Sequence, residues 1–357
     1  MSSQETAAHP RRWNGLLGAV RGSTLARSLA LLFFGGIALV VISELLSEYR
    51  NLQLAEGGYY FAVLAGLTML IGSSGQISLG HGALMAVGAY AVALLVGDEH
   101  WPLFAALVAA VVATALVGVP LGAAASRLRG PYLAGVTLAF AVALPPLGNR
   151  FPETLGGENG LTITQPTPPS GLGSGFPPER WLAWIACAGA LIVAFVLYNL
   201  MRSGVGRSLR AIRDDEVAAS LCGLHVGRNL TLAFVVSAAC AGLAGGLLVV
   251  VLGLAQPGAF PLKLSLALLS GVVIGGQGSL VGAVWGAALL VLLPNWTTDI
   301  AHSFSFSTNV SSNLPLAVYG VMLIVAMLAW PSGIQGGVRV LSSRLRGVLR
   351  ARRDAAR

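Results

Sequence analysis

Ten long apolar segments divide this chain, and they limit what it can fold into. A helix needs about 20 mainly apolar residues to cross the hydrocarbon core of a bilayer, and each segment is close to that length. We therefore expect an all-α integral membrane protein with about ten transmembrane helices. The expected spans are residues 28–47, 57–74, 77–97, 102–125, 131–149, 181–201, 230–253, 264–280, 282–298 and 313–331.

The composition favours one membrane domain rather than two soluble ones. Charged residues make up 10% of the chain and hydrophobic residues 55%, whereas soluble domains are roughly 25% charged. We expect a transmembrane domain over residues 28–331, between a polar tail (1–27) and a basic tail (332–357). Residues 1–27 are polar and the first apolar segment is long enough to span, so no cleavable signal is expected.

Net charge and cysteine content argue against two other classes of protein. The net charge is +8, but the arginines are spread over loops without interleaved aromatic residues, which argues against nucleic-acid binding. The three cysteines have no CxxC spacing, so neither a disulfide framework nor a metal site is indicated.

The basic residues predict the orientation of the spans. If the N-terminus is cytoplasmic, 18 of the 22 basic residues fall inside, and only Arg50, Arg150, Arg180 and Lys263 fall outside. Positive charge collects on the cytoplasmic side of membrane proteins. We therefore expect a multi-pass membrane protein with both termini in the cytoplasm.

Charged residues are missing from the middle of every expected span. Intramembrane acids and bases are the usual mark of proton relays, so this pattern argues against a proton-driven carrier. His81 is the one titratable side chain near membrane depth. Two interpretations of it stay open, a hydrogen-bonded structural histidine and a proton carrier.

Two glycine-rich stretches interrupt the apolar pattern. Residues 72–82 are too polar for lipid exposure, so they indicate either tight helix packing or a broken helix beside a water-filled path. In the second interpretation Gln76, Ser78 and His81 lie near the translocation path, and polarity at depth adds Tyr132 and Thr137. In residues 271–287, Gly282 and Gly286 form a GxxxG pair, which favours helix packing over a dinucleotide site because no βαβ unit is present.

The loop over residues 150–180 contains six prolines and six glycines, and we expect it outside. It is either a flexible linker or a docking surface for an external partner. Residues 154–160 at its start predict a defined turn.

A charged segment, residues 203–228, separates two apolar spans and is expected in the cytoplasm. Leu209 and Ile212 alternate with arginines in the pattern of a short amphipathic helix. Asp214 or Asp215 is a good N-cap, and Gly223 suits the position after a C-terminus. The segment predicts a helix over 216–222, and the alternative is a solvated loop.

Together these motifs resemble the branched-chain amino acid ABC transporter permeases of the LivM type. The matching stretches, in the family's order over most of residues 60–290, are GQISLGHG (75–82) with GAY (88–90), RGPYLA (129–134) with TLAF (137–140), GG (156–157) with GL (160–161), RAIRDDEVAA (210–219), AF (233–234) through AGLAG (241–245), and GGQGS (275–279).

The resemblance implies an ABC importer permease bundle in a bacterial plasma (inner) membrane and a set of partners. These are a second homologous permease of the LivH type, two ATPase subunits and an external solute-binding protein. It also implies that the charged segment is the coupling helix seated on an ATPase. The residues it assigns to that contact are Arg207, Arg210, Arg213, Asp214, Asp215, Glu216, Ala219 and Gly223. Val217 separates Glu216 from the alanines, unlike the usual Glu-Ala-Ala pattern, which puts the details of the contact in doubt.

The residues of this chain also indicate that ATP is hydrolysed by partner subunits. There is no G-x-x-x-x-G-K-[ST] loop, and Lys263 is the only lysine. ATP and Mg²⁺ are therefore expected on partner chains, with no cofactor on this one and no enzymatic activity. Three alternatives stay open: a self-contained secondary transporter or channel, a membrane enzyme, and the same architecture carrying urea, short amides or aromatic acids.

Overall fold

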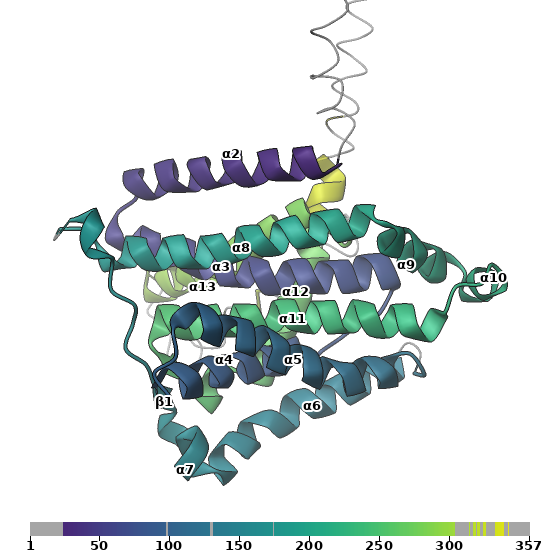
Figure 1. The fold of residues 1–357 in the computed structure, drawn as a ribbon, viewed down its shortest axis with the longest axis horizontal. Helices are drawn as coiled ribbons and strands as arrows, with labels where there is room; N and C mark the ends of the chain where they lie inside the picture. The colour runs from purple at the N-terminus through teal and green to yellow at the C-terminus, as the bar shows by residue number, and fades with distance from the viewer. Residues whose placement is uncertain are drawn as a thin grey trace, which may run out of the picture.

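The protein is a bundle of long helices in a computed structural model (Figure 1). The structure describes residues 24–97, 99–128, 131–173 and 175–303, with parts of 314–342. The long helices are α2 (Thr24–Leu45), α3 (Glu48–Met69), α4 (His81–Gly97), α5 (Leu103–Ala125), α6 (Pro131–Arg150), α8 (Pro178–Arg202), α11 (Val226–Leu252), α12 (Leu262–Gly275) and α13 (Leu280–Ser303).

Nine of the ten expected spans correspond to these helices. Within the described part of the chain, seven helices are long and apolar enough to cross a membrane, and α4 and residues 280–296 of α13 are shorter apolar helices. The tenth expected span, 313–331, falls mostly outside the described residues. The chain is therefore a multi-pass helical membrane protein.

Several of the expected boundaries were wrong, including the starts of the second and third spans. The second span begins at Glu48 rather than at residue 57, because the Asn51 amide donates to the Ser43 and Leu46 carbonyls and fixes a tight turn after α2. Glu56, which precedes the expected second span, consequently lies within α3. The third span begins at His81 rather than at residue 77, because Gly75, with φ 72°, ends the preceding helix in a left-handed conformation.

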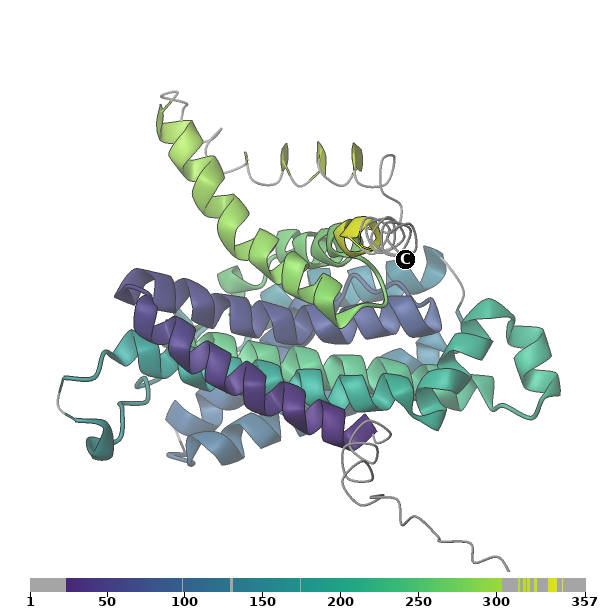
Figure 2. The ribbon, with the colours of Figure 1, turned by 90° about the horizontal axis from the view of Figure 1, so that it is seen from above.

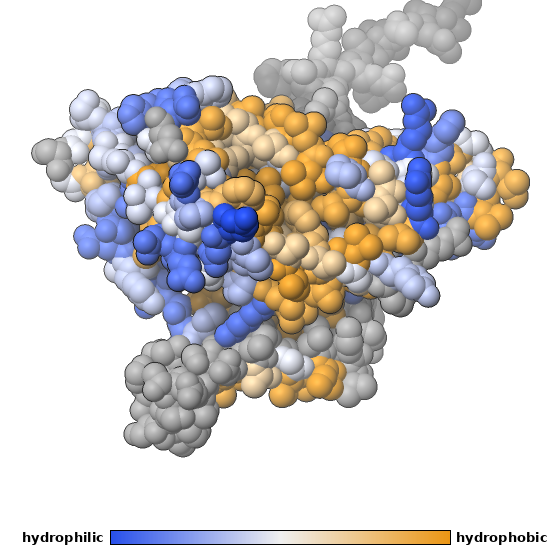
Figure 3. All heavy atoms as spheres, turned by 90° about the horizontal axis from the view of Figure 1, so that it is seen from below, coloured by the Kyte–Doolittle hydropathy of each residue, from blue (hydrophilic) through white to orange (hydrophobic). Residues whose placement is uncertain are grey.

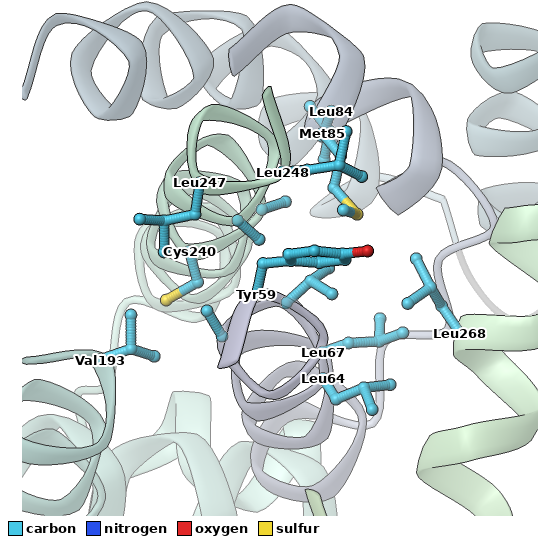
Figure 4. Packing of buried hydrophobic residues seen from close by; sticks show 14 of the residues in the cluster. Tyr59, Leu64, Leu67, Leu84, Met85, Val193, Cys240, Leu247, Leu248 and Leu268 are labelled. Carbon is cyan, nitrogen blue, oxygen red and sulfur yellow. The ribbon is translucent and has the colours of Figure 1, made fainter. Parts of the chain in front are cut away.

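The core lies where α11 packs against α3, α4 and α5. Buried side chains from five helices meet there, as Figure 4 shows for Tyr59, Leu64, Leu67, Leu84, Met85, Val193, Cys240, Leu247, Leu248 and Leu268. Small residues bring the backbones together. A Cβ atom at Gly88 of α4 would lie 2.7 Å from the Gly242 carbonyl carbon of α11. Such close approach is typical of helix packing in membranes.

Short elements gather at the two ends of the bundle. At one end, β1 (Leu161–Thr162) pairs antiparallel with β2 (Leu254–Ala255), near α7 (Pro152–Leu155), η2 (Gly157–Asn159), η3 (Ser170–Leu172) and η4 (Pro257–Ala259). The turn predicted over residues 154–160 is present there, with Gly156 at φ 73°. At the opposite end, α9 (Gly204–Asp214) and α10 (Glu216–Leu221) project beyond the long helices (Figures 1 and 2).

The surface is sorted by polarity along the bundle. Figure 3 shows an apolar zone across the middle of one face and hydrophilic residues toward both ends. Large apolar side chains such as Phe33, Phe34, Phe104 and Leu116 are exposed along α2 and α5. A monomeric soluble protein rarely exposes so much contiguous apolar surface, whereas a bilayer solvates it.

The contact between α4 and α11 gives a stability prediction. Gly88→Ala is expected to lower the free energy of unfolding by about 1–3 kcal/mol, because the added methyl group overpacks the crossing. Thermal unfolding of the purified protein in detergent measures this as a lower midpoint. Gly135→Ala is the control, since nothing lies within 4 Å of a Cβ atom there. Equal midpoints for the two variants would contradict the tight crossing.

Candidate functional site

The first part of the site is α9, which is anchored to the end of α8. Leu209 and Ile212 are buried, while the arginines on its other side are exposed. Arg210 donates to the Met201 carbonyl at 2.9 Å and Arg207 to the Arg202 carbonyl at 3.3 Å. Both arginines therefore satisfy carbonyls at the C-terminus of α8, where cationic side chains are favoured by the helix dipole.

The helix predicted over residues 216–222 is confirmed as α10, Glu216–Leu221. Asp215 is its N-cap, and one carboxylate oxygen accepts from the Val217 and Ala218 amides at 2.9 Å each. Gly223 follows the helix with φ 82°. Because the Asp215 backbone is extended (φ −153°, ψ 109°), α9 and α10 are separate helices with a sharp junction.

One side of α10 packs against the rest of the protein, and another side is exposed. Ala219 is buried in a small cluster with Ile212 and Leu230. Val217 is 66% exposed and Leu221 is 83% exposed. A short helix at a polar end of the molecule therefore presents apolar side chains that nothing in the described chain covers.

The second part of the site is the broken segment, residues 70–80, which joins α3 to α4. It starts with a π-helical turn, η1 (Leu70–Ser74), and continues without helix from Gly75 to Gly80. Such π-turns are rare and are frequently found at functional sites. The segment is largely buried although it contains serine and glutamine side chains.

Side chains of α6 and α12 accept hydrogen bonds from backbone amides at and just after the break. The Thr137 hydroxyl of α6 accepts from the Leu79 amide at 3.0 Å, and the Ser265 hydroxyl of α12 accepts from the Gly82 amide at 3.1 Å. The His81 ring lies 3.0 Å from the Ser78 hydroxyl through Nδ1 and 2.7 Å from the Ser237 hydroxyl through Nε2. Both ring nitrogens thus have partners, which favours the structural interpretation of His81.

The five residues proposed for a translocation path do not all meet. Ser78, His81 and Thr137 lie together around the break, and Gln76 is buried two residues away from Ser78. Tyr132 is 75% exposed on α6 and is separate from them. Polarity at membrane depth does not reveal which face of a helix a residue occupies.

The charged segment and the broken segment touch. The Arg213 guanidinium of α9 donates to the Gly72 carbonyl in η1. A cavity of about 260 Å³ lies beside this contact, between α9, α10, the broken segment and the neighbouring ends of α5 and α6. This contact could not be predicted from a local motif, because its two partners are 141 residues apart in the chain.

The same turn of η1 also touches the junction of α12 and α13. Gly72 packs directly against Gly278, and a Cβ atom at Gly72 would overlap its backbone. Beyond that junction, Gly282 approaches Gly275 and Gly286 approaches Gly271. The helix-packing interpretation of Gly282 and Gly286 is confirmed. A continuous line of contacts therefore runs from the Arg213 side chain of α9 through the Gly72 backbone to the backbones of α12 and α13.

Comparison with known proteins identifies what this arrangement resembles. The family described as "Branched-chain amino acid transport system / permease component" matches residues 52–327. The high-affinity branched-chain amino acid transport system permease protein LivM of Salmonella typhimurium is 29% identical over 353 residues, covering 93% of this chain and 80% of the relative.

Two further relatives belong to transport systems described in the same words. LivM of Escherichia coli (strain K12) is 29% identical, covering 89% of this chain and 77% of the relative. The permease protein LivH of Salmonella typhimurium is 26% identical, and the match covers 78% of this chain and 92% of the relative. No solved structure matches the chain significantly.

The cap of α10 gives a local prediction. Asp215→Ala is expected to destabilise α10 by about 1 kcal/mol, because two amide groups lose their acceptor. Hydrogen exchange followed by mass spectrometry should show the α10 amides exchanging about fivefold faster. Asp214→Ala is the matched control, since Asp214 is the last residue of α9 and does not cap α10. If both variants exchange alike, Asp215 is not the cap.

Proposed function

The chain belongs to the family of branched-chain amino acid transport permeases, and we propose that it is the membrane-spanning subunit of an ATP-driven importer for branched-chain amino acids. Its relatives are named as permease proteins of such systems. In this proposal the protein sits in a bacterial inner membrane with α9 and α10 in the cytoplasm. The distribution of basic residues supports that orientation.

The observation that carries the proposal is the bare apolar side of α10. Val217 and Leu221 are exposed on α10, which lies beyond the long helices at one end of the bundle (Figure 1). At that position a membrane would not solvate them. An apolar groove on a soluble partner is the natural counterpart of such a helix, which is a recurring mode of recognition. We assign α10 to a groove on an ATPase subunit. Three residues set the position of that helix. Glu216 begins its first turn, Ala219 makes its buried contact with the protein, and Gly223 follows its end.

Energy has to come from other chains in this scheme. The sequence contains no P-loop, and its only lysine, Lys263, is in the first turn of α12. Two ATPase subunits would therefore bind the ATP and Mg²⁺. LivM and LivH both resemble this chain, which supports pairing with a second homologous permease. A soluble binding protein would deliver the solute at the opposite end, where β1, β2 and residues 150–180 gather.

The contacts that run from Arg213 through Gly72 to Gly278 suggest how a displacement of α10 is transmitted to the membrane-spanning helices. Arg213 links α9 to the Gly72 carbonyl, and Gly72 packs on Gly278 between α12 and α13. Movement of the charged segment then shifts the broken segment and the α12–α13 junction together. ATP binding to the partner favours one of two arrangements, and transport follows from the switch.

The residues around the break lie near the inner end of the path in this scheme. Ser78, His81 and Thr137 hold the non-helical backbone in place, and Gln76 faces the cavity. Tyr132 lies on the outer side of α6, where it would face lipid or another subunit.

Docking of α10 can be tested at Leu221. Leu221→Asp is expected to weaken co-purification of the ATPase subunits at least about tenfold, because burial of one leucine contributes about 1.5–3 kcal/mol. Leu221→Met is the control that keeps the apolar contact. Membrane levels of the permease should stay unchanged, since Leu221 is 83% exposed in the isolated chain. Normal association of Leu221→Asp would rule out this face of α10.

Transmission can be tested at Arg213. Arg213→Ala is expected to leave the ATPases bound but to lower uptake per ATP hydrolysed. The loss is about tenfold if the full hydrogen bond to the charged group, about 1.5 kcal/mol, contributes to coupling. Uptake and ATP hydrolysis are measured together in proteoliposomes. Arg228→Ala, at another exposed arginine at the same end of the bundle, is the control. An unchanged ratio for Arg213→Ala would show that the Gly72 contact is not on the route.

A further inference from the structure

The cavity between the charged segment and the broken segment combines an apolar lining with opposite charges. Its apolar part comes from Ile77, Leu128, Leu133, Ile212 and Leu230. Its volume of about 260 Å³ lies just below the roughly 300–1,000 Å³ of pockets for drug-sized ligands. The cavity is therefore large enough for a small metabolite but not for a drug-sized ligand.

The polar part of the cavity can recognise two opposite charges. Arg213 and Glu216 both line it, three residues apart on either side of the α9–α10 junction. The Arg213 guanidinium has five N–H donors, and one of them is used on the Gly72 carbonyl. A guanidinium with donors remaining is well suited to a carboxylate.

Gln76 is the independent sign of a missing ligand. Its side chain lines the cavity and is only 5% exposed, yet its amide nitrogen has no hydrogen-bond partner. A buried donor without a partner is unfavourable, and an acceptor on a ligand in the cavity would satisfy it. The nearby Ser74 hydroxyl donates to the Leu70 carbonyl at 2.7 Å and lies 3.4 Å from the other end of the same amide, Gln76 Oε1, so the contact it makes is with the oxygen and not with the nitrogen.

We propose that this cavity binds a free aliphatic amino acid from the cytoplasmic side. Arg213 and the Gln76 amide bind the carboxylate, Glu216 binds the ammonium group, and the side chain lies against Leu133 and Leu230. The inference rests on the proposed function, which puts this end of the bundle in the cytoplasm. It adds a site for the imported product, separate from the delivery of solute at the other end.

Occupancy of the cavity has a consequence for transport. The ligand bridges α9, α10 and the broken segment, which are the parts that must move together or apart in the transport cycle. It therefore stabilises the one arrangement in which the cavity is formed, and slows exchange with the other. The product accumulated inside the cell then inhibits its own import.

The test uses the complete transporter in proteoliposomes, with ATP and Mg²⁺ in the lumen and the binding protein outside. The lumen is also loaded with unlabelled L-leucine, and the initial rate of labelled leucine uptake is measured. The rate is expected to fall several-fold as luminal L-leucine rises. Luminal 4-methylpentanoate, which lacks the ammonium group, and 3-methylbutylamine, which lacks the carboxylate, should inhibit much less.

Variants assign the inhibition to the cavity. Gln76→Leu is expected to raise the inhibitory concentration of L-leucine about tenfold, because a hydrogen bond to a charged group is lost. Leu128→Trp should do the same by filling the cavity. Thr68→Val is the matched control: its hydroxyl is also buried without a partner, but it does not line the cavity. Inhibition is compared with the uninhibited rate of each variant.

The outcomes separate this inference from the proposed function. Uptake without inhibition by luminal L-leucine, or equal inhibition of the wild type and Gln76→Leu, overturns the cavity site and leaves the importer intact. If the wild-type complex shows no uptake, the proposed function fails. Binding of labelled L-leucine to the purified permease then decides the cavity alone: weaker binding by Gln76→Leu and Leu128→Trp supports it, and unchanged or absent binding overturns it.

Discussion

The break between α3 and α4 leaves backbone amides that need hydrogen-bond acceptors, and the surrounding helices supply them. A chain that leaves the helical conformation inside an apolar bundle exposes amides that water cannot reach, and each needs a partner from the protein. Thr137 of α6 and Ser265 of α12 supply two of these partners, and Ser78 accepts from the Gly80 amide. The break therefore fixes α6 and α12 against the start of α4.

The same break makes backbone groups available for other contacts. In the π-turn, the Gly72 carbonyl can accept a hydrogen bond from Arg213, a residue of a different segment. The absence of a side chain at Gly72 also lets Gly278 approach. One irregular turn therefore contacts both the polar end of the bundle and the α12–α13 pair.

Several features could be predicted from the sequence because their signals are local. Apolar runs of membrane length give the helices, and Asp215 and Gly223 mark the two ends of α10. The early start of α3 was missed because its first turns carry Glu48, Arg50 and Asn51, which lower the apparent hydropathy. The pairing of Arg213 with Gly72 was missed because it joins distant parts of the chain, and Tyr132 was misjudged because polarity does not specify a helix face.

The small size of α10 has a consequence for assembly. A helix of six residues is far too short to persist by itself in water, but here the Asp215 cap and the contact of Ala219 with Ile212 and Leu230 hold it in shape. A partner subunit therefore meets a preorganised element, and little conformational entropy is lost when the two associate. The rate of complex formation should then be limited by the orientation of two rigid surfaces rather than by folding of the contact.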